Sequence, residues 1–421
     1  MNRLHNDFKK ILYVFMRRFY WCIPIIIRSR LQWIRYSLSY WFRRHVAQEE
    51  LEDGDLAWHE FLPIILQNGK YPVIIFELNV DWNIVLIQRP HQMALALGRL
   101  GCLVIFKTVG DISSGYRHVA DNVWLSNDES VDDISGAIRI FYSTSLLACS
   151  EDIWAAKKIG FVIYEYIDHI DASISGTRSN VRRLLAMKKS ALDGGADLVV
   201  ASSSALYSEA MTTCKGTQCL LLPNGVDVEH YRLGRLRHVE FSEALMDFRV
   251  KYSRVVGYFG AIAPWLWYES LAYLAKVMPD VGFMLIGPDY NGSIKYIPRS
   301  ENIFYNGAVN YELLPAFANI FDVCFIPFKP GPIAQATSPL KLYEYFSLEK
   351  PVVVTADMYE CLKYPEVFVG NTPRELRNAI SKAFEVCSNT DYKEKMRALA
   401  EANSWDIRAN MYLDVLEKCI I

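Results

Sequence analysis

The feature that most constrains the fold of this chain is a repeated alternation, from Tyr71 onward, of short β-branched or aromatic runs with longer stretches of helical periodicity. Such alternation is typical of parallel β-sheets covered by helices. Strands are predicted at 73–78, 102–108, 138–143, 161–167, 198–202 and 220–223, and then at 255–259, 283–286, 303–305, 323–327 and 352–355. Because 421 residues exceed what one core of ordinary size holds, the pattern predicts two consecutive α/β domains.

The border between the two domains is predicted to follow residues 223–227 (PNGVD), where an apolar strand gives way to turn residues. Ser404 is expected to cap a last helix, with Ile407, Met411 and Val415 on one apolar face at helical spacing. The expected parts are an arm at 1–50, a first domain at 51–228, a second at 229–404 and a crossover helix at 405–421.

Charge and cysteine usage exclude some classes of protein. Residues 1–48 carry ten Lys or Arg and one Asp, whereas the remaining chain has 35 basic and 46 acidic residues. An acidic body argues against a nucleic-acid-binding protein, which needs a basic face.

The nine cysteines lack zinc-type spacing, even at the closest pair, Cys214 and Cys219, so we expect reduced, mostly buried thiols. No signal-peptide pattern is evident, and we expect a cytoplasmic protein.

The basic leading segment interleaves aromatic residues with arginines over residues 8–44. Its longest uncharged run, residues 19–27, is nine residues long, whereas a membrane-spanning helix needs about 20 apolar residues. Aromatic rings beside arginines suit the boundary of an anionic membrane. We therefore expect residues 1–48 to lie on the inner face of the cell membrane. The alternative is that the aromatics dock onto the catalytic body or a partner protein.

The most informative stretch is residues 336–346 (ATSPLKLYEYF), between two predicted strands. Ser338 is predicted as an N-cap and Pro339 as the first helical residue, followed by Leu340. A helix that begins at the carboxyl edge of a parallel sheet offers free N–H groups where nucleotides and phosphates bind. Lys341 adds a positive charge, and Glu344 on the same face can accept hydrogen bonds from ribose hydroxyls. The stretch predicts a diphosphate site beside a sugar site; a plain surface ion pair is the alternative.

Several blocks of sequence resemble the family 4 glycosyltransferases of the GT-B fold, particularly bacterial cell-surface polysaccharide enzymes. From about residue 71 to 410, in the family's order, they are QRPHQ (88–92), LPNGVD (222–227), GYFG (257–260), LIGP (285–288), FDVCFIPF (321–328), SPLKLYEY (338–345) and PVV (351–353). The resemblance implies an α/β GT-B fold of two facing Rossmann-like domains with parallel sheets. The first domain would bind the acceptor and the second a nucleotide-diphosphate sugar.

The resemblance also assigns roles to the residues of the 336–346 stretch. Lys341 matches the family's diphosphate lysine, and Glu344 matches the second glutamate of the E-x7-E motif, which holds the ribose. The first glutamate of that motif falls at Ala336, which has no carboxylate. The implied reaction retains anomeric configuration and needs no metal or other cofactor, with the departing diphosphate stabilised by Lys341 and helix amides. The implied acceptor is a lipid-linked saccharide or a polysaccharide.

Three further positions are candidates for the site. Gly257 and Gly260 follow the opening of the second domain's first strand, where small residues let a phosphate or sugar approach the backbone; an ordinary turn is the alternative. Arg89 is predicted to steady a phosphate through its forked donors, unless it is a solvated charge at a helix start.

Asp168 ends a predicted strand, and we expect it to hold acceptor hydroxyls and count it with Lys341 and Arg89 as catalytic. Metal binding is not expected, because Asp168, His169 and Asp171 are too close in sequence to converge readily on one ion.

Two other functions stay open. One is a nucleotide-sugar epimerase of the same fold, which needs a paired acid and base at the sugar carbon. The other is a catalytically inactive relative that recruits proteins to the membrane, which Ala336 suggests.

Overall fold

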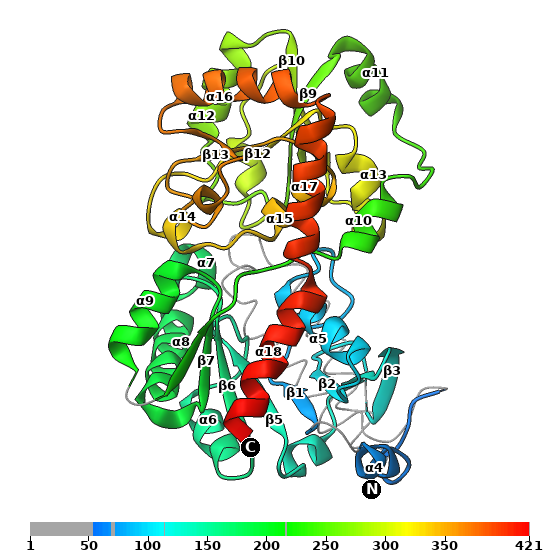
Figure 1. The fold of residues 1–421 in the computed structure, drawn as a ribbon, viewed down its shortest axis with the longest axis vertical. Helices are drawn as coiled ribbons and strands as arrows, with labels where there is room; N and C mark the ends of the chain where they lie inside the picture. Colours follow the sequence, from blue (N-terminus) through cyan, green and yellow to red (C-terminus); the bar gives the residue numbers. More distant parts are fainter. Residues whose placement is uncertain (1–53, 69–71, 113, 215–216, 421) are drawn as a thin grey trace, which may run out of the picture. The chain divides into compact units, whose positions relative to one another are not determined.

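The structure, a computed structural model, describes residues 54–420 apart from 69–71, 113 and 215–216 (Figure 1). The predicted membrane-binding arm at 1–48 lies outside the described residues. By its contacts the chain divides into two compact units. Unit 1 holds the described residues of Met1–Ile84, Met93–Ala201 and Tyr207–Leu220, and unit 2 holds those of Val85–Gln92, Ser202–Leu206 and Leu221–Ile421.

Unit 1 is built on an eight-stranded sheet with the order β3-β4-β2-β1-β5-β6-β7-β8. The strands are β1 (Ile74–Phe76), β2 (Val104–Lys107), β3 (Tyr116–Ala120), β4 (Val123–Ser126), β5 (Ile138–Tyr142), β6 (Phe161–Tyr166), β7 (Leu198–Ala201) and β8 (Gln218–Leu221). From β4 to β7 all neighbours pair in parallel, in the 3-2-1-4-5-6 order of doubly wound sheets. The predicted Rossmann-like architecture is therefore confirmed for this unit.

The β3–β4 hairpin is the part of this sheet that the sequence pattern missed. β3 pairs antiparallel with β4, so the sheet is mixed rather than wholly parallel as predicted. The hairpin covers a small core together with α4 (Trp58–Gln67). Phe61 of α4 stacks on Tyr116 at 4.0 Å between ring centroids and meets Trp124 edge-on at 5.0 Å. β3 is an edge strand with one buried residue of five, and β4 is only four residues long, so neither shows the continuous apolar run of the central strands.

The other helices of this part of the chain follow the expected α/β alternation. They are α5 (Arg89–Arg99), η1 (Glu129–Asp133), α6 (Ser150–Lys157), α7 (Ala172–Ser175), α8 (Arg178–Ser190), η2 (Ala191–Gly195) and α9 (Ser204–Thr213). Helices α6 and α8 pack together with η2, and α6 also packs on β6.

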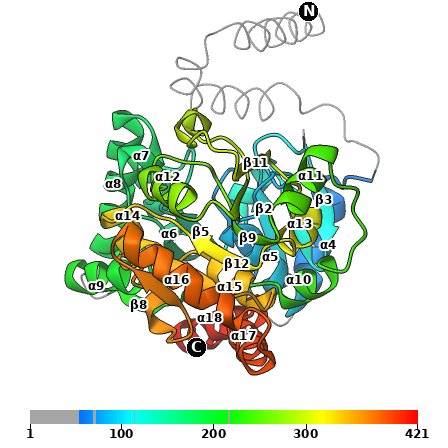
Figure 2. The same ribbon diagram turned by 90° about the horizontal axis from the view of Figure 1, so that it is seen from above.

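Unit 2 is built on a six-stranded sheet with the order β11-β10-β9-β12-β13-β14. The strands are β9 (Arg254–Phe259), β10 (Val281–Ile286), β11 (Ile303–Gly307), β12 (Val323–Ile326), β13 (Val352–Thr355) and β14 (Phe368–Gly370). All neighbours pair in parallel, again in the 3-2-1-4-5-6 order. The order reverses between β9 and β12, which adjoin one another in the view from above (Figure 2).

Helices cover this sheet as expected for a doubly wound fold. They are α10 (Val228–Gly234), α11 (Glu243–Lys251), α12 (Tyr268–Val277), η3 (Ser293–Tyr296), η4 (Tyr311–Leu313), α13 (Leu314–Ala318), α14 (Pro332–Ala336), α15 (Leu340–Ser347), η5 (Cys361–Lys363), α16 (Pro373–Val386), α17 (Thr390–Ala402) and α18 (Trp405–Ile420). Helix α12 packs beside α16, whereas α15 packs on β12 and β13 and beside α17 (Figure 1).

The final helix confirms one prediction and corrects another. The backbone N–H of Ile407 donates to Ser404 Oγ at 3.3 Å, so Ser404 caps α18 as predicted. The predicted apolar face is wrong, because Ile407 and Met411 are 41% and 37% exposed. The buried face consists of Trp405, Arg408, Ala409, Tyr412, Leu413 and Leu416. Spacing alone did not reveal this face because it includes the buried guanidinium of Arg408, which donates to the carbonyl of Asn224 at 3.2 Å.

Candidate functional site

The carboxyl ends of β9 and β12 mark the point in unit 2 where the strand order reverses. Open parallel sheets bind ligands at this switch point, outside the ends of the strands. The Lys341 ammonium lies there: its Nζ is 5.5 Å from the ring centroid of Tyr258 on β9 and 5.3 Å from that of Phe328, just after β12. Helix α15 thus carries Lys341 to the place where the fold itself predicts a ligand.

Two glycines let the chain come close to Lys341. Gly260 follows β9 with a φ of 136°, and a Cβ added there would lie 2.9 Å from Cε of Lys341. Gly287 follows β10 with a φ of 145°, and a Cβ there would lie 1.9 Å from the carbonyl oxygen of Gly260. The two strand ends therefore need glycine at both positions. Sequence reasoning did not select Gly287, although a Gly-Pro pair directly after an apolar strand could have pointed to it.

Gly257 has a different reason to be glycine. It lies inside β9, and a Cβ there would come within 2.1 Å of the Phe321 ring. Phe321 is fully buried in the core of unit 2. The close approach at Gly257 is therefore to a core side chain. A contact of Gly257 or Gly260 with a donor stays a prediction.

The start of α15 differs from the prediction by one residue. The helix begins at Leu340, and Pro339 is the N-cap with an extended backbone (φ −77°, ψ 124°), so the assignments of Ser338 as N-cap and Pro339 as first helical residue are wrong. The Ser338 hydroxyl instead accepts the backbone N–H of Asn224 at 3.2 Å, and its carbonyl accepts Asn224 Nδ2 at 2.5 Å. This tertiary contact uses the oxygen that would otherwise cap the helix.

Glu344 is buried on α15, one turn beyond Lys341, and is only 8% exposed. Burial raises its pKa to about 7, while the Tyr231 hydroxyl and the charge of Lys341 act in the opposite direction. The carboxyl group therefore changes charge near neutral pH. Its charged form also helps to raise the pKa of Tyr231 and Tyr311, although burial is the main cause for both phenols.

Tyr231 and Tyr311 belong to an aromatic group beside Glu344 that sequence reasoning missed. The Tyr311 ring stacks on His230 at 4.0 Å, and its hydroxyl accepts a hydrogen bond from Gln92 Nε2 at 2.7 Å. These residues come from α10, η4 and the start of α5, segments far apart in sequence. No local motif marks them, so only the fold could bring them to notice.

Arg89 belongs to unit 2 and is buried, with 1% of its surface exposed. Its Nη1 lies 3.2 Å from both the carbonyl of Pro223 and Oδ1 of Asn224, and its guanidinium lies over the Trp405 ring at 5.9 Å. Arg89 thus helps to hold Asn224, which in turn holds Ser338 at the start of α15. These contacts give it a positioning role, and the predicted phosphate contact stays a prediction.

Asp168 lies in unit 1, directly after β6, and its backbone N–H is 3.4 Å from Ser143 Oγ, which follows β5. It is half-buried at the carboxyl edge of the sheet, as its position in the sequence predicted. Asp171 caps α7 by accepting the backbone N–H of Ser173 at 2.8 Å. Within the described part of the chain, no group of three or more His, Cys, Asp or Glu residues is placed to hold a metal ion.

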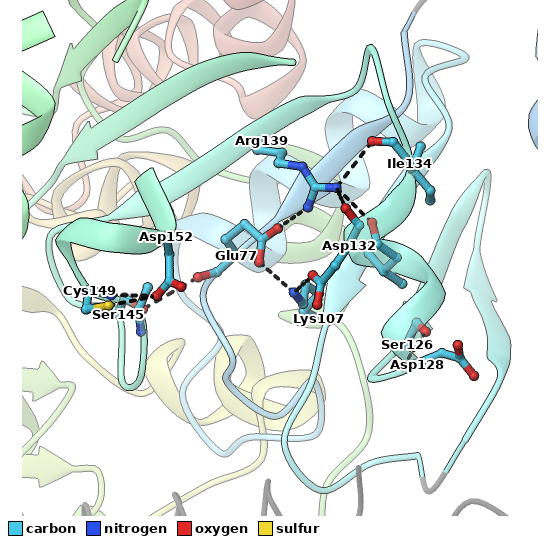
Figure 3. Close-up of polar contacts among 12 residues, drawn as sticks. Glu77, Lys107, Ser126, Asp128, Asp132, Ile134, Arg139, Ser145, Cys149 and Asp152 are labelled. Carbon is cyan, nitrogen blue, oxygen red and sulfur yellow. Dashed lines mark hydrogen bonds and ion pairs between the residues drawn. The ribbon is translucent and has the colours of Figure 1, made fainter. Parts of the chain in front are cut away.

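A mostly buried network of charges in unit 1 joins Glu77 and Lys107, at the carboxyl ends of β1 and β2, to Arg139 near the start of β5 and to Asp132 of η1 (Figure 3). Glu77 bonds Arg139 Nη1 at 2.5 Å and Lys107 Nζ at 2.8 Å, and Lys107 also bonds Asp132 at 2.7 Å. Arg139 Nη2 donates to the carbonyls of Val131, Asp132 and Ile134 around η1. These charges neutralise one another within the fold, and the network joins the sheet to η1.

Comparison with known proteins gives one curated sequence relative. No protein-family model matches the chain. The chain is 28% identical over 260 residues to a protein assigned to teichuronic acid biosynthesis, the glycosyltransferase TuaH of Bacillus subtilis (strain 168). The match covers 58% of this chain and spans 64% of the length of the relative.

Solved structures share the fold at low sequence identity. A sucrose-phosphate synthase from Thermosynechococcus elongatus superposes with a TM-score of 0.61 at 14% identity, over 83% of this chain and 99% of that one. HepE from Anabaena, in complex with UDP, gives 0.58 at 14% identity over 83% and 100%. Trehalose-6-phosphate synthase from E. coli, bound with UDP-2-fluoro glucose, gives 0.62 at 11% identity over 82% and 99%. The chain therefore has the GT-B fold, and its resemblance to family 4 cell-surface polysaccharide glycosyltransferases is confirmed.

Proposed function

We propose that this protein is a glycosyltransferase that moves a sugar from a nucleotide-diphosphate donor to a lipid-linked saccharide or polysaccharide, with retention of configuration and without a metal. The observation that carries the proposal is the position of Lys341 at the switch point of unit 2, with Glu344 one turn further along the same helix. The relative's role in teichuronic acid biosynthesis supports a cell-surface polysaccharide as the product.

Lys341 supplies the positive charge for the departing diphosphate. Its Nζ lies over the aromatic faces of Tyr258 and Phe328, which leave an ammonium positively charged and attractive to phosphate oxygens. The first turn of α15, from Leu340, adds backbone N–H groups that have no acceptor within the helix. Preorganised donors of this kind stabilise the charge that develops as the glycosidic bond breaks. The leaving phosphate itself accepts the proton of the acceptor hydroxyl.

Glu344 holds the ribose in this proposal. A carboxylate accepts hydrogen bonds from two adjacent hydroxyls, and the buried setting of Glu344 strengthens such bonds. UDP is bound in solved structures of the same fold, which supports a uridine nucleotide as the first donor to try. Ala336, buried at the end of α14, offers no carboxylate for the sugar, so the sugar hydroxyls must be held by other groups.

The acceptor side is proposed for unit 1, with Asp168 holding acceptor hydroxyls at the carboxyl edge of its sheet. We further propose that the enzyme works in the cytoplasm at the inner face of the cell membrane and that residues 1–48 bind anionic lipid. Among the described helices, none has the length and apolar character needed to span a bilayer. Flotation of the full chain and of a chain lacking residues 1–48 with anionic vesicles tests the second point, and equal flotation would refute it.

The test of the donor proposal is release of free nucleotide from a panel of nucleotide sugars by the purified full chain, with a lipid-linked saccharide as acceptor. Transfer with one donor, lost in Lys341→Ala, supports the proposal. Isotope or epimer exchange in the donor without transfer would favour the epimerase. A chain that binds no nucleotide diphosphate by calorimetry would be the inactive relative suggested by Ala336.

A further inference from the structure

Two thiols of unit 1 lie in contact outside the site described above. Cys214 directly follows α9, and Cys219 lies in β8, the edge strand of the eight-stranded sheet. Their sulfur atoms are 3.3 Å apart, and either thiol can donate a hydrogen bond to the other. Both residues are half-buried and both thiols are free.

The geometry is close to that of a disulfide without being one. A disulfide needs its sulfurs about 2.0 Å apart, so the two must approach by a further ~1.3 Å. Four residues separate the two cysteines in the sequence. The end of α9 and strand β8 place their side chains in contact. A reaction between groups already held in contact is effectively unimolecular, which favours it over reaction of either thiol with a second molecule.

We propose that Cys214 and Cys219 form a reversible dithiol–disulfide site that is oxidised by low-molecular-weight disulfides. The Cys219 thiolate attacks one sulfur of the small disulfide, whose sulfur–sulfur bond breaks to release one small thiolate. The Cys214 sulfur then attacks the Cys219 sulfur of the mixed disulfide, which releases the second small thiolate. The protein loses two protons and two electrons, and the oxidant becomes two thiols that carry the two protons.

The order of attack follows from the surroundings of Cys214. Burial and the neighbouring thiol raise the pKa of Cys214 to about 12, so its thiolate is scarce at neutral pH. Cys214 is therefore the poorer first nucleophile, and we assign it the role of resolving thiol. Because both steps use thiolates, the oxidation speeds up as the pH rises.

The site has a defined place in the fold. The disulfide bond would join the carboxyl end of α9 to β8. Cys219 lies five residues before Asn224, whose backbone N–H and side chain donate hydrogen bonds to Ser338. Disulfides that form and break in the cytoplasm are mostly redox-sensing rather than structural. A bond that closes so short a loop is suited to reversible formation, since a short loop contributes little chain-entropy stabilisation.

Digestion with trypsin shows directly whether the disulfide has formed, because trypsin cuts after Lys215, which lies between the two cysteines in the sequence. Cleavage leaves Cys214 in peptide 190–215 and Cys219 in peptide 216–232, each with no other cysteine, so only a disulfide can join them. The native full chain is treated with glutathione disulfide, quenched in acid, alkylated and digested. We expect the linked pair of peptides, lighter by two hydrogens than their sum, to form at least about tenfold faster than a glutathione adduct at Cys149, and to vanish after incubation with dithiothreitol.

Cys149, another half-buried thiol of unit 1, is the control for a thiol without a partner sulfur; burial raises its pKa to about 11, and its Sγ donates to Asp152 Oδ2 at 3.2 Å. Cys149→Ser should leave the yield of the linked peptides unchanged. Cys214→Ser should stop at a glutathione adduct on Cys219, whereas Cys219→Ser should leave Cys214 largely unmodified. Separate adducts on both cysteines of the native chain, or a linkage no faster than the Cys149 adduct, would overturn the proposal.

Discussion

Units 1 and 2 share the same order of parallel strands but treat charge differently at the carboxyl ends of those strands. In unit 1, the buried carboxylate of Glu77 is bonded to two buried cations, and Asp132 completes a neutral network. In unit 2, Lys341 lies over two aromatic rings beside a glycine, and the carboxyl of Glu344 has a pKa of about 7. One architecture thus uses charge to lock its own elements in unit 1, and in unit 2 it places a cation at the switch point, where we propose that it meets the diphosphate.

We expect the charged network of unit 1 to stabilise the fold. Of the substitutions considered, Glu77→Gln should lower the free energy of unfolding most. Removing one partner leaves Lys107 and Arg139 buried with a lost ion pair, which costs about 3–5 kcal/mol. Urea unfolding followed by circular dichroism measures this loss. Glu385→Gln, at an exposed glutamate of α16, is the control and should change the free energy of unfolding by less than about 0.5 kcal/mol. Equal effects of the two substitutions would mean that the network does not stabilise the unit.

Lys341→Ala should weaken the use of donor in unit 2 by about 10²–10³-fold in kcat/KM, because the ammonium that faces the diphosphate is lost. The fold should remain, since the side chain is half-exposed. Lys295→Ala is a matched control: Lys295 also lies over an aromatic ring, Tyr296 at 4.9 Å, but on an exposed 3-10 turn. Calorimetry with UDP and initial rates of nucleotide release measure both variants. Similar losses in the two would remove Lys341 from the site.

Much of this fold could be predicted from the sequence because its central strands are buried on both faces and appear as continuous apolar runs. All eleven predicted strands correspond to strands of the structure, whereas β3, β4 and β14 were missed. The first two form a hairpin at the sheet edge, in which β3 has one buried residue of five and β4 has four residues, and β14 is only three residues long. Periodicity gives a weak signal for such strands.

The candidate site was predictable only where its residues are close in sequence. Lys341 and Glu344 share one helix turn, so their spacing predicted a common site. Tyr231 and Tyr311 come from separate segments and show no motif. Ser338 and Arg89 were predicted from local rules, but both make contacts with Asn224 that local rules do not contain.

Glu344 should make unit 2 sensitive to pH in a way that unit 1 is not. Its pKa in the folded protein, about 7, lies above the ordinary value of 4.5, so the folded state binds the extra proton between these values. Its contribution to stability is therefore fully present below about pH 4.5 and is lost as the pH rises through 7, by about 3 kcal/mol in total. Relative to wild type, Glu344→Gln should gain stability as the pH is raised from 5 to 8.

Donor binding should show the opposite trend, because ribose hydroxyls donate to the charged carboxylate. The Kd for UDP in wild type should rise as the pH falls below about 7, whereas the Kd in Glu344→Gln should be weaker and should keep only the change due to the terminal phosphate of UDP, whose second pKa is about 6. Calorimetry between pH 5.5 and 8.5 measures both. The same pH dependence of the Kd in the two proteins would show that Glu344 does not meet the donor as a carboxylate.

Gly260→Ala tests whether the close approach of the backbone to Lys341 matters for binding. A Cβ there meets Cε of Lys341 at 2.9 Å, and the φ of 136° disfavours any side chain, so Lys341 must move and the affinity for UDP should fall about tenfold. Gly292→Ala separates the two causes, because its φ of 71° is also positive but nothing lies within 4 Å of the added Cβ. That control should lose about 1 kcal/mol of stability through backbone strain and keep its affinity. If both variants bound UDP as wild type does, the position of Lys341 at the switch point would not require the glycine, and the contrast between the two units would rest on charge alone.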